Sequence, residues 1–477
     1  MTIYQNLIAG EWIGTNATKN INPSDTNEVV GLYADGSAED TKNAIAAAKA
    51  AFPAWSRSGI WERHVILKKA GDEIMARKDE LGALLAREEG KTLPEAIGET
   101  IRASQIFEFF AGEALRLAGE VIPSVRPNVG VEITRDPLGV IGIITPWNFP
   151  IAIPAWKIAP ALCYGNTIVF KPAELVPACS WAIVDILHRA GLPKGVLNLV
   201  MGKGSVVGQA MLDSPDIAGI TFTGSTGTGK RVAVSSLEHN RKFQLEMGGK
   251  NPMVVLDDAD LNVAVEAAAN SGFFSTGQRC TASSRLIVTE GIHDRFVAAL
   301  TEKLKTIVVD HAMKPGTHVG PVVDERQLKT DTDYIEIGKK EGAKLAFGGE
   351  LITRDTPGFY LQPTLFTEAT NQMRISREEI FGPVVSVIRV KDYEEALATA
   401  NDTPFGLSSG IATTSLKHAT HFKRNAEAGM VMVNLPTAGV DFHVPFGGRK
   451  GSSYGPREQG KYAAEFYTTV KTAYTLA

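Results

Sequence analysis

The stretch LGVIGIITPWNFPIAIPAWKIAPALCYGNTIVFKP, residues 138–172, indicates the fold of this chain. Two short β-branched runs, Val140–Ile144 and Thr167–Phe170, are typical of buried strands, and Ile151–Leu162 between them has the length and pattern of a helix. A strand, a helix and a strand in direct succession predict a βαβ unit, whose two strands lie parallel in one sheet. The stretch is apolar, but its prolines and Lys157 argue against a membrane span.

The same alternation of strand and helix extends in both directions along the chain. Ser37-Ala38-Glu39-Asp40 has the pattern of a capping box that opens a helix running to Phe52, and a charged helical stretch follows from about Trp61 to Leu117. Beyond residue 172 the predicted strands are Val196–Val200, Ile217–Phe222, Met253–Leu256, Arg285–Thr289, Phe381–Val390 and Val431–Asn434, and the predicted helices are Val176–Ala190, Ser205–Leu212 and Leu261–Phe274. We expect solvated helices in His293–Glu341 and a loop at Gly348–Phe359. The pattern predicts two α/β regions, the second beginning near Asn251, with a site between them.

Length, composition and charge limit the classes of protein to which the chain can belong. Its 477 residues suffice for two or three domains, and 44% hydrophobic with 21% charged residues is typical of a globular protein. A net charge of -4 argues against a nucleic-acid partner, and the N-terminal residues lack the pattern of a secretion signal. The three cysteines, at 163, 179 and 280, cannot form a disulfide framework and lack the paired spacing of a zinc site. We therefore expect a cytoplasmic enzyme with no membrane partner and no metal.

A glycine-rich motif, GSTGTGK at residues 224–230, follows the predicted strand Ile217–Phe222 and nearly matches the phosphate loop of nucleotide hydrolases. Arg231 stands where that loop needs a magnesium-binding hydroxyl. A P-loop hydrolase is therefore the alternative of a different class, and we expect instead that the start of the following helix binds a dinucleotide pyrophosphate.

Two further glycine motifs are weaker signals. GKGSVVG at residues 202–208 lies after a strand and opens a helix, as a dinucleotide fingerprint does, but Val207 takes the place of its third glycine. Helix-capping glycines are the alternative there. GLSSG at residues 406–410 has the letters of a nucleophile elbow, but a helical segment at Ala396–Ala400 precedes it and an extended one follows, which reverses the order that a hydrolase needs. We predict a turn into a strand.

Other motifs carry reactive side chains. Cys280 lies in STGQRCT, residues 275–281, where the adjacent Arg279 favours the thiolate, although a lone cysteine is more often core filler. Glu246 lies in QLEMGGKNP, residues 244–252, as a carboxylate in an apolar strand before paired glycines, which is unusual for a solvated charge. The remaining motifs of this kind are PWNFP at 146–150 with Asn148, KPAE at 171–174 with Lys171 and Glu174, and EIFGP at 379–383 with Glu379.

In this order, and from Gly10 to Lys471, these motifs resemble those of the aldehyde dehydrogenase superfamily. The matching set also includes FTGS at residues 222–225 and PFGG at residues 445–448. Met247 departs from the leucine of many members, but the exchange conserves volume. Within the superfamily the sequence looks most similar to bacterial α-ketoglutaric semialdehyde (2,5-dioxovalerate) dehydrogenases, with succinic semialdehyde dehydrogenases next.

The resemblance implies an α/β fold of the aldehyde dehydrogenase type with a Rossmann-type cofactor domain. Residues 1–118 and 138–248 would form this dinucleotide-binding domain, and residues 249–448 a second α/β, catalytic domain. Residues 119–137 and 449–477 would form a small β oligomerisation element. A homo-oligomer is therefore expected, a homotetramer or a dimer, since extended edge segments commonly pair across a two-fold axis.

The resemblance also implies the catalytic roles. Cys280 would attack the aldehyde carbon, Asn148 and the Cys280 N–H would stabilise the oxyanion, and Glu246 would activate the water that hydrolyses the thioester. Glu458 would relay protons to bulk water or would form a surface ion pair. The presence of Cys280, Glu246 and Asn148 argues against a structural relative that has lost the cysteine, such as a lens crystallin.

The implied cofactor is NAD, with NADP tolerated through Lys171. The Glu174 carboxylate can accept hydrogen bonds from both ribose hydroxyls and would repel a 2′-phosphate. The predicted cofactor-binding residues are Ile144, Thr145, Pro146, Trp147, Lys171, Ala173, Glu174, Gly204, Gly208, Phe222, Thr223, Gly224, Ser225, Thr228, Met247, Gly248, Glu379 and Phe381.

The implied substrate is a small-molecule aldehyde that enters a mostly apolar channel. The predicted substrate-binding residues are Phe149, Ile153, Trp156, Arg279, Thr281, Val440, His443 and Phe446. The Arg279 guanidinium would pair with the carboxylate of a semialdehyde acid, or it would form a structural ion pair or only lower the thiol pKa. Many succinic semialdehyde enzymes carry an arginine where Trp156 stands, which favours a longer or α-keto acid here. Succinic semialdehyde and other aliphatic or aromatic aldehydes are the alternatives.

Overall fold

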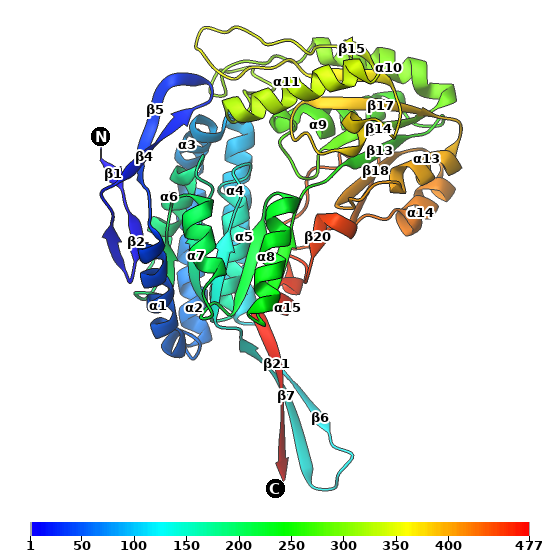
Figure 1. Ribbon diagram of the computed structural model, residues 1–477. Helices are drawn as coiled ribbons and strands as arrows, with labels where there is room; N and C mark the ends of the chain where they lie inside the picture. Colours follow the sequence, from blue (N-terminus) through cyan, green and yellow to red (C-terminus); the bar gives the residue numbers. More distant parts are fainter. Residues whose placement is uncertain (1, 477) are drawn as a thin grey trace.

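The computed structural model describes residues 2–476, which form two α/β units with a narrow arm of strands projecting from the first (Figure 1). The first unit is an eight-stranded sheet in the order β20 (Ser453–Tyr454), β12 (Lys242–Glu246), β11 (Gly219–Thr223), β8 (Val140–Ile144), β9 (Thr167–Lys171), β10 (Leu197–Leu199), β2 (Asn6–Ile8) and β3 (Glu11–Ile13). The strands from β12 to β10 run parallel. The chain winds outward from β8 through β9 to β10 and then, on the other side, through β11 to β12. Ligands of doubly wound sheets bind at such a reversal, beyond the carboxyl ends of the strands.

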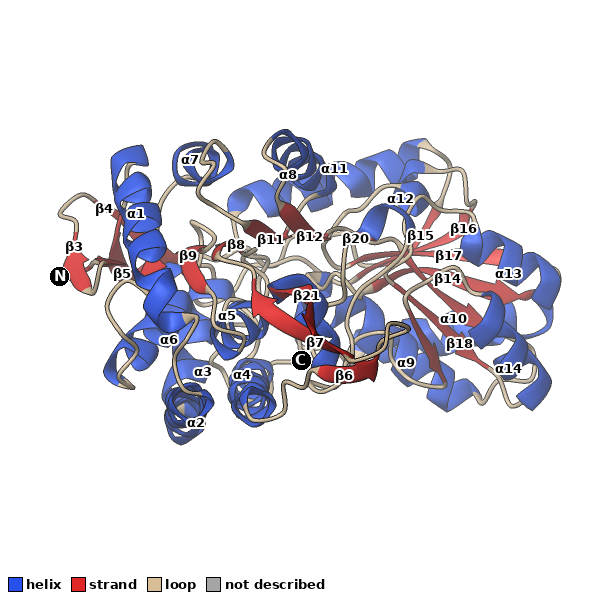
Figure 2. Ribbon diagram, turned by 90° about the horizontal axis from the view of Figure 1, so that it is seen from below, coloured by secondary structure: helices blue, strands red, loops and turns tan. Residues whose placement is uncertain are grey.

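Helices cover both faces of this sheet (Figure 2). One face carries α1 (Ala38–Trp55), α7 (Gln209–Leu212) and α8 (Thr226–Glu238), and the other carries α2 (Ile60–Ala76), α3 (Lys78–Glu89), α4 (Leu93–Ala114), α5 (Ala152–Cys163) and α6 (Pro177–Arg189). Alternate residues of β8 supply the two cores, because successive strand side chains point to opposite faces. Ile144 belongs to the core that contains Val232 of α8, and Ile143 to the core that contains Phe107 of α4. Burial on both faces explains the continuous apolar run of this strand.

The elements predicted for the first unit are confirmed, with shifted ends. Ser37 caps α1 with both hydrogen bonds of the capping box, and the helix continues beyond Phe52 to Trp55. The helical stretch from Trp61 to Leu117 is not continuous: it consists of α2, α3 and α4. Gly90 ends α3 in the left-handed region, at φ 98°, where glycine carries no steric penalty. The predicted helix Ser205–Leu212 is a short π-helical turn, Gly204–Gly208, followed by α7.

The second unit is a seven-stranded sheet in the order β15 (Lys344–Phe347), β16 (Thr364–Ala369), β17 (Val384–Val390), β14 (Ser283–Thr289), β13 (Asn251–Val255), β18 (Ser408–Ala412) and β19 (Met430–Val433). Only the edge strand β15 runs antiparallel to its neighbour among these described strands. Helices again lie on both sides: α9 (Leu261–Phe273), α10 (Glu290–Lys305), α11 (Glu325–Lys340), α12 (Arg374–Arg377), α13 (Tyr393–Asn401) and α14 (Leu416–Asn425). The apolar side chains of the sheet divide between two core clusters in the same way.

Most predictions for this unit are confirmed. The strand predicted from Phe381 begins only at Val384, because Phe381 takes a left-handed conformation, at φ 66°, in the preceding loop. His293–Glu341 contains helical residues of α10 and α11, but residues 306–324 between them are not helical. The GLSSG motif leads from α13 into β18, in the reverse order of a nucleophile elbow, as predicted.

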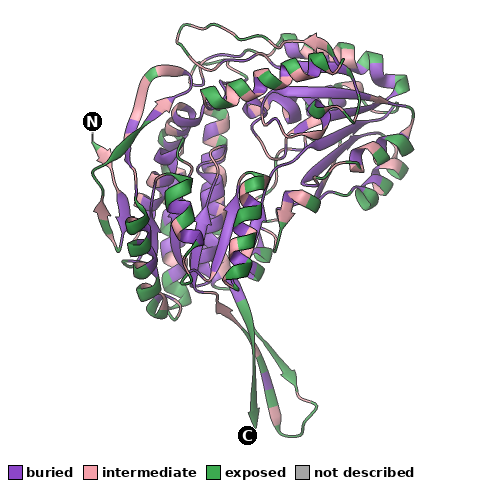
Figure 3. Ribbon diagram, in the orientation of Figure 1, coloured by how far each residue is buried: buried purple, intermediate pink, exposed green. Residues whose placement is uncertain are grey.

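Two three-stranded sheets complete the chain. One, β1 (Ile3–Tyr4), β5 (Asp25–Ala34) and β4 (Ala17–Asn22), lies in an N-terminal region for which we made no strand prediction. The other forms the arm: β21 (Thr468–Leu476) pairs antiparallel with β7 (Val129–Pro137), which pairs with β6 (Glu120–Pro123). The strands expected in residues 119–137 and 449–477 are therefore present, and the short helix α15 (Ala464–Tyr467) precedes β21. Figure 3 shows that most of the arm is exposed in the single chain. Within residues 2–476, no helix has the length and apolar character needed to cross a membrane.

The division into domains stays a prediction. Along the chain, β12 is the last strand of the first large sheet before residue 248, and β13 of the second sheet follows it. Ser453–Tyr454 adds β20 to the first sheet, so residues 449–477 contribute to that sheet as well as to the arm.

Candidate active site

The carboxyl ends of the parallel strands of the first sheet carry most of the predicted cofactor-binding residues. Ile144 to Trp147 end and follow β8, Lys171 to Glu174 end and follow β9, Phe222 to Ser225 lead from β11 into α8 with Thr228 in its first turn, and Met247 and Gly248 follow β12. These strands are parallel neighbours, so their ends share one edge of the sheet. Residues more than a hundred positions apart thereby come together at the point where the direction of winding reverses.

Lys171, Glu174, Gly204 and Gly208 lie together at this edge. The Glu174 carboxylate accepts a hydrogen bond from the Gly204 N–H at 2.5 Å, and the Lys171 Nζ donates to the Pro172 carbonyl at 2.6 Å. A Cβ on Gly204 or Gly208 would lie 3.7 or 3.8 Å from the Lys171 side chain. Burial lowers the pKa of Lys171 to about 8, and the neighbouring Glu174 opposes that shift. Because neither glycine has a side chain, the surface of this sheet edge stays open beside the Lys171 ammonium and the Glu174 carboxylate.

The start of α8 lies at the same edge, near polar groups that have no hydrogen-bond partner within residues 2–476. Ser225 is the N-cap, and its Oγ accepts from the Thr228 N–H at 3.4 Å. The buried hydroxyls Thr145 Oγ1 and Thr223 Oγ1 have no hydrogen-bond partner within residues 2–476, and the space beside Gly227 is open. Unpartnered buried hydroxyls are uncommon, and a helix N-terminus favours a phosphate. These features fit a bound dinucleotide.

Glu379 reaches this region from the second unit. Its Oε1 accepts from the Gly249 N–H at 2.8 Å, and a Cβ on Gly248 would lie 2.1 Å from its Oε2. The paired glycines therefore admit the carboxylate. Burial raises the pKa of Glu379 to about 6. Two loops also meet here, because the ring of Phe381 packs edge-on against Trp147 with centroids 5.3 Å apart.

A cavity of about 310 Å³ opens beside Cys280, where the two units meet. Six predicted substrate-binding residues line it: Phe149, Trp156, Arg279, Thr281, Val440 and Phe446. Two others do not: Ile153 is 1% exposed in the core of α5, and His443 is exposed to solvent outside the cavity. Trp156 stacks on Phe446 with ring centroids 5.2 Å apart. Much of the wall is therefore apolar.

Charged residues of the cavity wall, Lys91, Glu95, Glu99 and Arg102, were missed by the sequence analysis. Charges along a helix usually indicate a solvated face, and α4 has many. The sequence does contain a signal for this face of the helix. Its members, of which Glu99 stands among buried neighbours, share the i, i+3, i+4, i+7 spacing of one helix face: Glu95, Gly98, Glu99 and Arg102.

Lys91 and Glu99 hold the turn that carries Asn148. The Lys91 Nζ donates to the Asn148 carbonyl at 2.6 Å and to Glu99 Oε2 at 2.7 Å. Glu99 Oε1 accepts from the N–H groups of Ile151 and Ala152 at 3.0 and 3.1 Å. Asn148 is buried, and its Nδ2 donates one hydrogen bond to the Gln278 carbonyl at 3.0 Å, next to the Cys280 segment. The turn that carries the amide is thus held by Lys91 and by Glu99 of α4, and the amide itself is bonded to the Cys280 segment.

Glu95 holds the segment that carries Cys280. Its Oε1 accepts from the Ser275 N–H at 2.8 Å and from the Arg279 Nη2 at 3.1 Å. The Arg279 Nη1 also donates to the Asn270 side-chain oxygen at 3.3 Å. Arg279 was expected to bind the substrate carboxylate, to form a structural ion pair or to lower the thiol pKa. The structure shows a structural ion pair with Glu95.

The positive charge of Arg279 interacts with Cys280 but does not make the thiol acidic. Burial, together with the carboxylates of Glu246 and Glu379, raises the pKa of the Cys280 thiol to about 12. The guanidinium is turned toward Glu95, so its charge is compensated there. The side chain remains partly accessible from the cavity.

Glu246 ends β12 with its carboxyl group buried, and the Ser453 hydroxyl donates to it. Burial, reinforced by the charge of Glu458, raises its pKa well above the ordinary value. A carboxyl group with a raised pKa can accept and release a proton near neutral pH.

Glu458 is not a surface residue: it is 2% exposed, and its ion pair with Lys157 is buried. Lys157 also donates to Thr221 Oγ1 at 2.7 Å. Burial raises the pKa of Glu458, and Lys157 opposes the shift. The surface ion pair is therefore excluded, and Glu458 lies close enough to Glu246 for their charges to interact.

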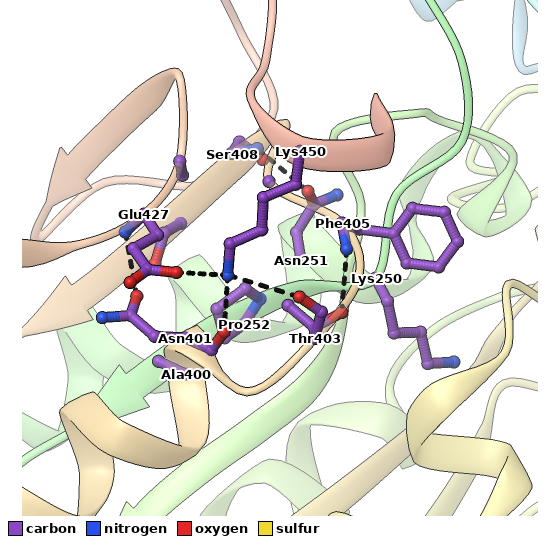
Figure 4. A pocket seen from close by; sticks show the side chains of 13 residues that line it. Lys250, Asn251, Pro252, Ala400, Asn401, Thr403, Phe405, Ser408, Glu427 and Lys450 are labelled. Atoms are coloured by element: carbon purple, nitrogen blue, oxygen red, sulfur yellow. Dashed lines mark hydrogen bonds and ion pairs between the residues drawn. The ribbon is translucent and has the colours of Figure 1, made fainter. Parts of the chain in front are cut away.

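A second hollow, of about 10 Å³, lies between β18, the segment after α13 and Lys450 (Figure 4). The Lys450 Nζ donates to the Asn401 carbonyl at 2.6 Å and pairs with Glu427, whereas the buried Lys250 Nζ has no hydrogen-bond partner within residues 2–476. Ser408, the central serine of the GLSSG motif, donates to the Thr281 carbonyl at 3.4 Å. The space admits one water at most, and its serine is bound to backbone, so we assign no chemistry to it.

Comparisons with known proteins agree with this geometry. The model of the "Aldehyde dehydrogenase family" matches residues 12–473. The chain is 46% identical to the α-ketoglutaric semialdehyde dehydrogenase of Bacillus subtilis, over 99% of this chain and 98% of that protein. It is 42% identical to the 2,5-dioxopentanoate dehydrogenase of Saccharolobus solfataricus, over 99% of each. A crystal structure of betaine aldehyde dehydrogenase from Staphylococcus aureus in complex with NAD+ superimposes with a TM-score of 0.97 at 34% identity, covering 99% of this chain and 95% of that one.

The raised thiol pKa predicts how Cys280 reacts with pH in the protein without added ligand. Because the group is a neutral thiol below its pKa of about 12, its thiolate fraction should rise about tenfold per pH unit between pH 7 and 9. Alkylation by iodoacetamide, followed by mass spectrometry of the Cys280 peptide, should show this rise. The buried Cys163 and Cys179 serve as internal controls that stay unmodified. A rate that levels off between pH 7 and 8 would instead indicate a thiol activated in advance.

Proposed function

Because the chain belongs to the aldehyde dehydrogenase family and is therefore an oxidoreductase that acts on aldehydes, we propose that it oxidises a semialdehyde acid of the α-ketoglutaric semialdehyde type with NAD. The convergence of three separate segments carries this proposal. Cys280 lines the cavity, Asn148 donates to the Gln278 carbonyl two residues before it, and the Glu246 carboxylate is near enough for its charge to act on the Cys280 thiol. Relatives at 46% and 42% identity that are named for this semialdehyde support the substrate class. Succinic semialdehyde is the alternative within the same class, since a plant enzyme named for it is 38% identical.

In the proposed mechanism Cys280 is the nucleophile. The thiol gives its proton to water in the cavity, the thiolate Sγ forms a bond to the aldehyde carbon, and the negative charge moves to the aldehyde oxygen. The Asn148 side chain has one N–H engaged with the Gln278 carbonyl and a second available for this oxygen, together with the Cys280 backbone N–H. Because Lys91 and Glu99 hold the Asn148 turn before substrate arrives, the donor is preorganised and needs little rearrangement.

Glu246 is the proposed base for the second half of the reaction. After oxidation the acyl group remains on Cys280 as a thioester, and water must attack it. The Glu246 carboxylate removes a proton from that water, and Glu458 with Lys157 lies behind it to pass the proton onward. The raised pKa of Glu246 makes it a stronger base than a solvated carboxylate once it is ionised.

We propose that the winding reversal of the first sheet binds NAD. Lys171 and Glu174 would hold the adenosine ribose, Gly224 and Ser225 would place the pyrophosphate at the start of α8, and Glu379 would hold the nicotinamide ribose. When bound, the nicotinamide ring supplies the hydride acceptor for the oxidation. NAD+ bound to the similar Staphylococcus aureus enzyme supports this assignment.

We also propose a homo-oligomer built through the arm. Large apolar side chains of β6, of β21 and of the turn between β6 and β7 are exposed in the single chain, including Val121, Val125, Val470, Tyr474 and Leu476. Exposed apolar strands favour pairing with another copy of the chain. The three cysteines are free, which is compatible with the reducing cytoplasmic compartment that we propose for it.

Activity across a panel of aldehydes tests the function directly. With NAD, absorbance at 340 nm should report higher kcat/KM for α-ketoglutaric semialdehyde and succinic semialdehyde than for propanal. Cys280→Ala should abolish turnover and keep dinucleotide binding, measured by intrinsic fluorescence, because the thiol performs chemistry and contributes little to binding. Turnover retained by Cys280→Ala would contradict the mechanism, and a wild-type preference for propanal would contradict the substrate class.

Glu246→Gln should separate the two halves of the reaction. The amide keeps the shape of the side chain but cannot accept a proton, so thioester hydrolysis should slow far more than its formation. Stopped-flow measurements should show a burst of NADH of about one equivalent per site and then a slow steady state, as expected when the second step limits turnover. A normal steady state without a burst would rule out Glu246 as the base.

Glu174 predicts the choice of cofactor. Its carboxylate would accept hydrogen bonds from the ribose hydroxyls of NAD and repel the 2′-phosphate of NADP, so the wild type should have the lower KM for NAD. Glu174→Gln should narrow the ratio of the two KM values by raising that for NAD and lowering that for NADP. A wild-type KM lower for NADP than for NAD would overturn the assignment.

A further inference from the structure

Helix α4 presents one face to the cavity. Glu95, Gly98, Glu99 and Arg102 follow the i, i+3, i+4, i+7 spacing of a helix face, and all four line the cavity beside Cys280. Three carry charge. Together with Lys91 and Arg279 they are the charged side chains of the cavity wall in the described part of the chain.

Four of these five charges are already paired with one another. Arg279 pairs with Glu95 at 3.1 Å, and Lys91 pairs with Glu99 at 2.7 Å. Each of the two cations also donates to a fixed oxygen of the protein: Arg279 to Asn270, and Lys91 to the Asn148 carbonyl. These pairs bind the catalytic segments in place, and their charges are compensated before any substrate enters.

Arg102 is the exception. Its guanidinium makes no hydrogen bond and no ion pair within residues 2–476, although it is half-buried. Asp441 is the carboxylate whose charge acts on it, from beyond ion-pair distance, and burial lowers the Arg102 pKa. A half-buried guanidinium without a protein acceptor has lost part of its hydration without compensation, and an anion in the cavity would provide that compensation. One turn before it, Gly98 leaves open space, since a Cβ there would meet nothing within 4 Å.

We propose that Arg102 binds the carboxylate at the far end of the substrate and thereby selects semialdehyde acids over uncharged aldehydes. The proposal rests on the proposed function and names the residue that sets its substrate class. The planar guanidinium can donate two parallel hydrogen bonds to a carboxylate, and the space beside Gly98 allows the carboxylate to approach. Arg279 then acts as a positioning residue for the Cys280 segment.

The test compares three arginine variants on a charged and an uncharged aldehyde. Arg102→Gln should lower kcat/KM for α-ketoglutaric semialdehyde by about ten- to hundredfold, mainly through KM, and should lower that for propanal far less, because a hydrogen-bonded charge pair is lost only with the acid. Arg102→Lys should recover part of the loss. Arg279→Leu should lower kcat/KM for both aldehydes, mainly through kcat, because it loosens the Cys280 segment.

Arg116→Gln is the matched control. Arg116 follows the other end of α4, 62% exposed and paired with Glu113, so the variant removes the same charge without touching the cavity and should leave both activities close to wild type. A preference for the acid that survives Arg102→Gln, or equal losses for both aldehydes, would overturn the role of Arg102. A wild type that does not prefer the acid would instead overturn the proposed substrate, so the two failures are distinguishable.

Discussion

Two ion pairs made by one face of helix α4 hold the candidate active site together: the buried pair of Lys91 with Glu99 and the partly buried pair of Arg279 with Glu95. Lys91 and Glu99 bind the turn after β8, which carries Asn148, and Glu95 with Arg279 binds the segment before β14, which carries Cys280. These two segments belong to different sheets, and α4 is the element that contacts both. The distance between the thiol and the amide donor therefore depends on charges that take no part in the proposed chemistry. Removing one partner of such a buried pair leaves an uncompensated charge, which is strongly destabilising.

The same pairing shapes what the cavity can bind. An apolar wall that contains Phe149, Trp156, Val440 and Phe446 accommodates an alkyl chain, and compensated charges add little attraction for an anion. Selectivity for a charged substrate then depends on a cation without a partner. Arg102 has that property because its neighbours on α4 are already engaged. Whether the charge of a cavity-lining arginine is already paired is thus more informative about substrate selectivity than the presence of the arginine.

A separate buried set of groups handles protons. Glu246, Glu458 and Lys157 are all 3% exposed or less, and they lie where β12, the C-terminal segment and α5 meet. Burial raises the pKa of both carboxyl groups, and a single ammonium opposes it. Such a group of two carboxyls and one cation can gain or lose one proton at moderate electrostatic cost, which suits a base that must be regenerated in each cycle. The residues that line the apolar cavity and the groups that handle protons therefore belong to different segments around Cys280.

The sequence by itself determined the alternation of strands and helices, and its motifs indicated Cys280, Asn148 and Glu246 as candidate catalytic residues. These features are local: β-branched runs predict buried strands, capping residues predict helix starts, and each reactive side chain lies in its own short motif. The tertiary structure alone decided which charges are paired. Arg279 meets Glu95 across 184 positions, and Lys157 meets Glu458 across 301, so neither partner is visible from the spacing around it. The pairing of Arg279 with Glu95 and the burial of Cys280 could not be anticipated for this reason. Ile153 and His443 lie outside the cavity because packing sets the face of a helix and the direction of a loop. A charge acts on whatever lies within a few ångströms, and only the folded chain defines that neighbourhood.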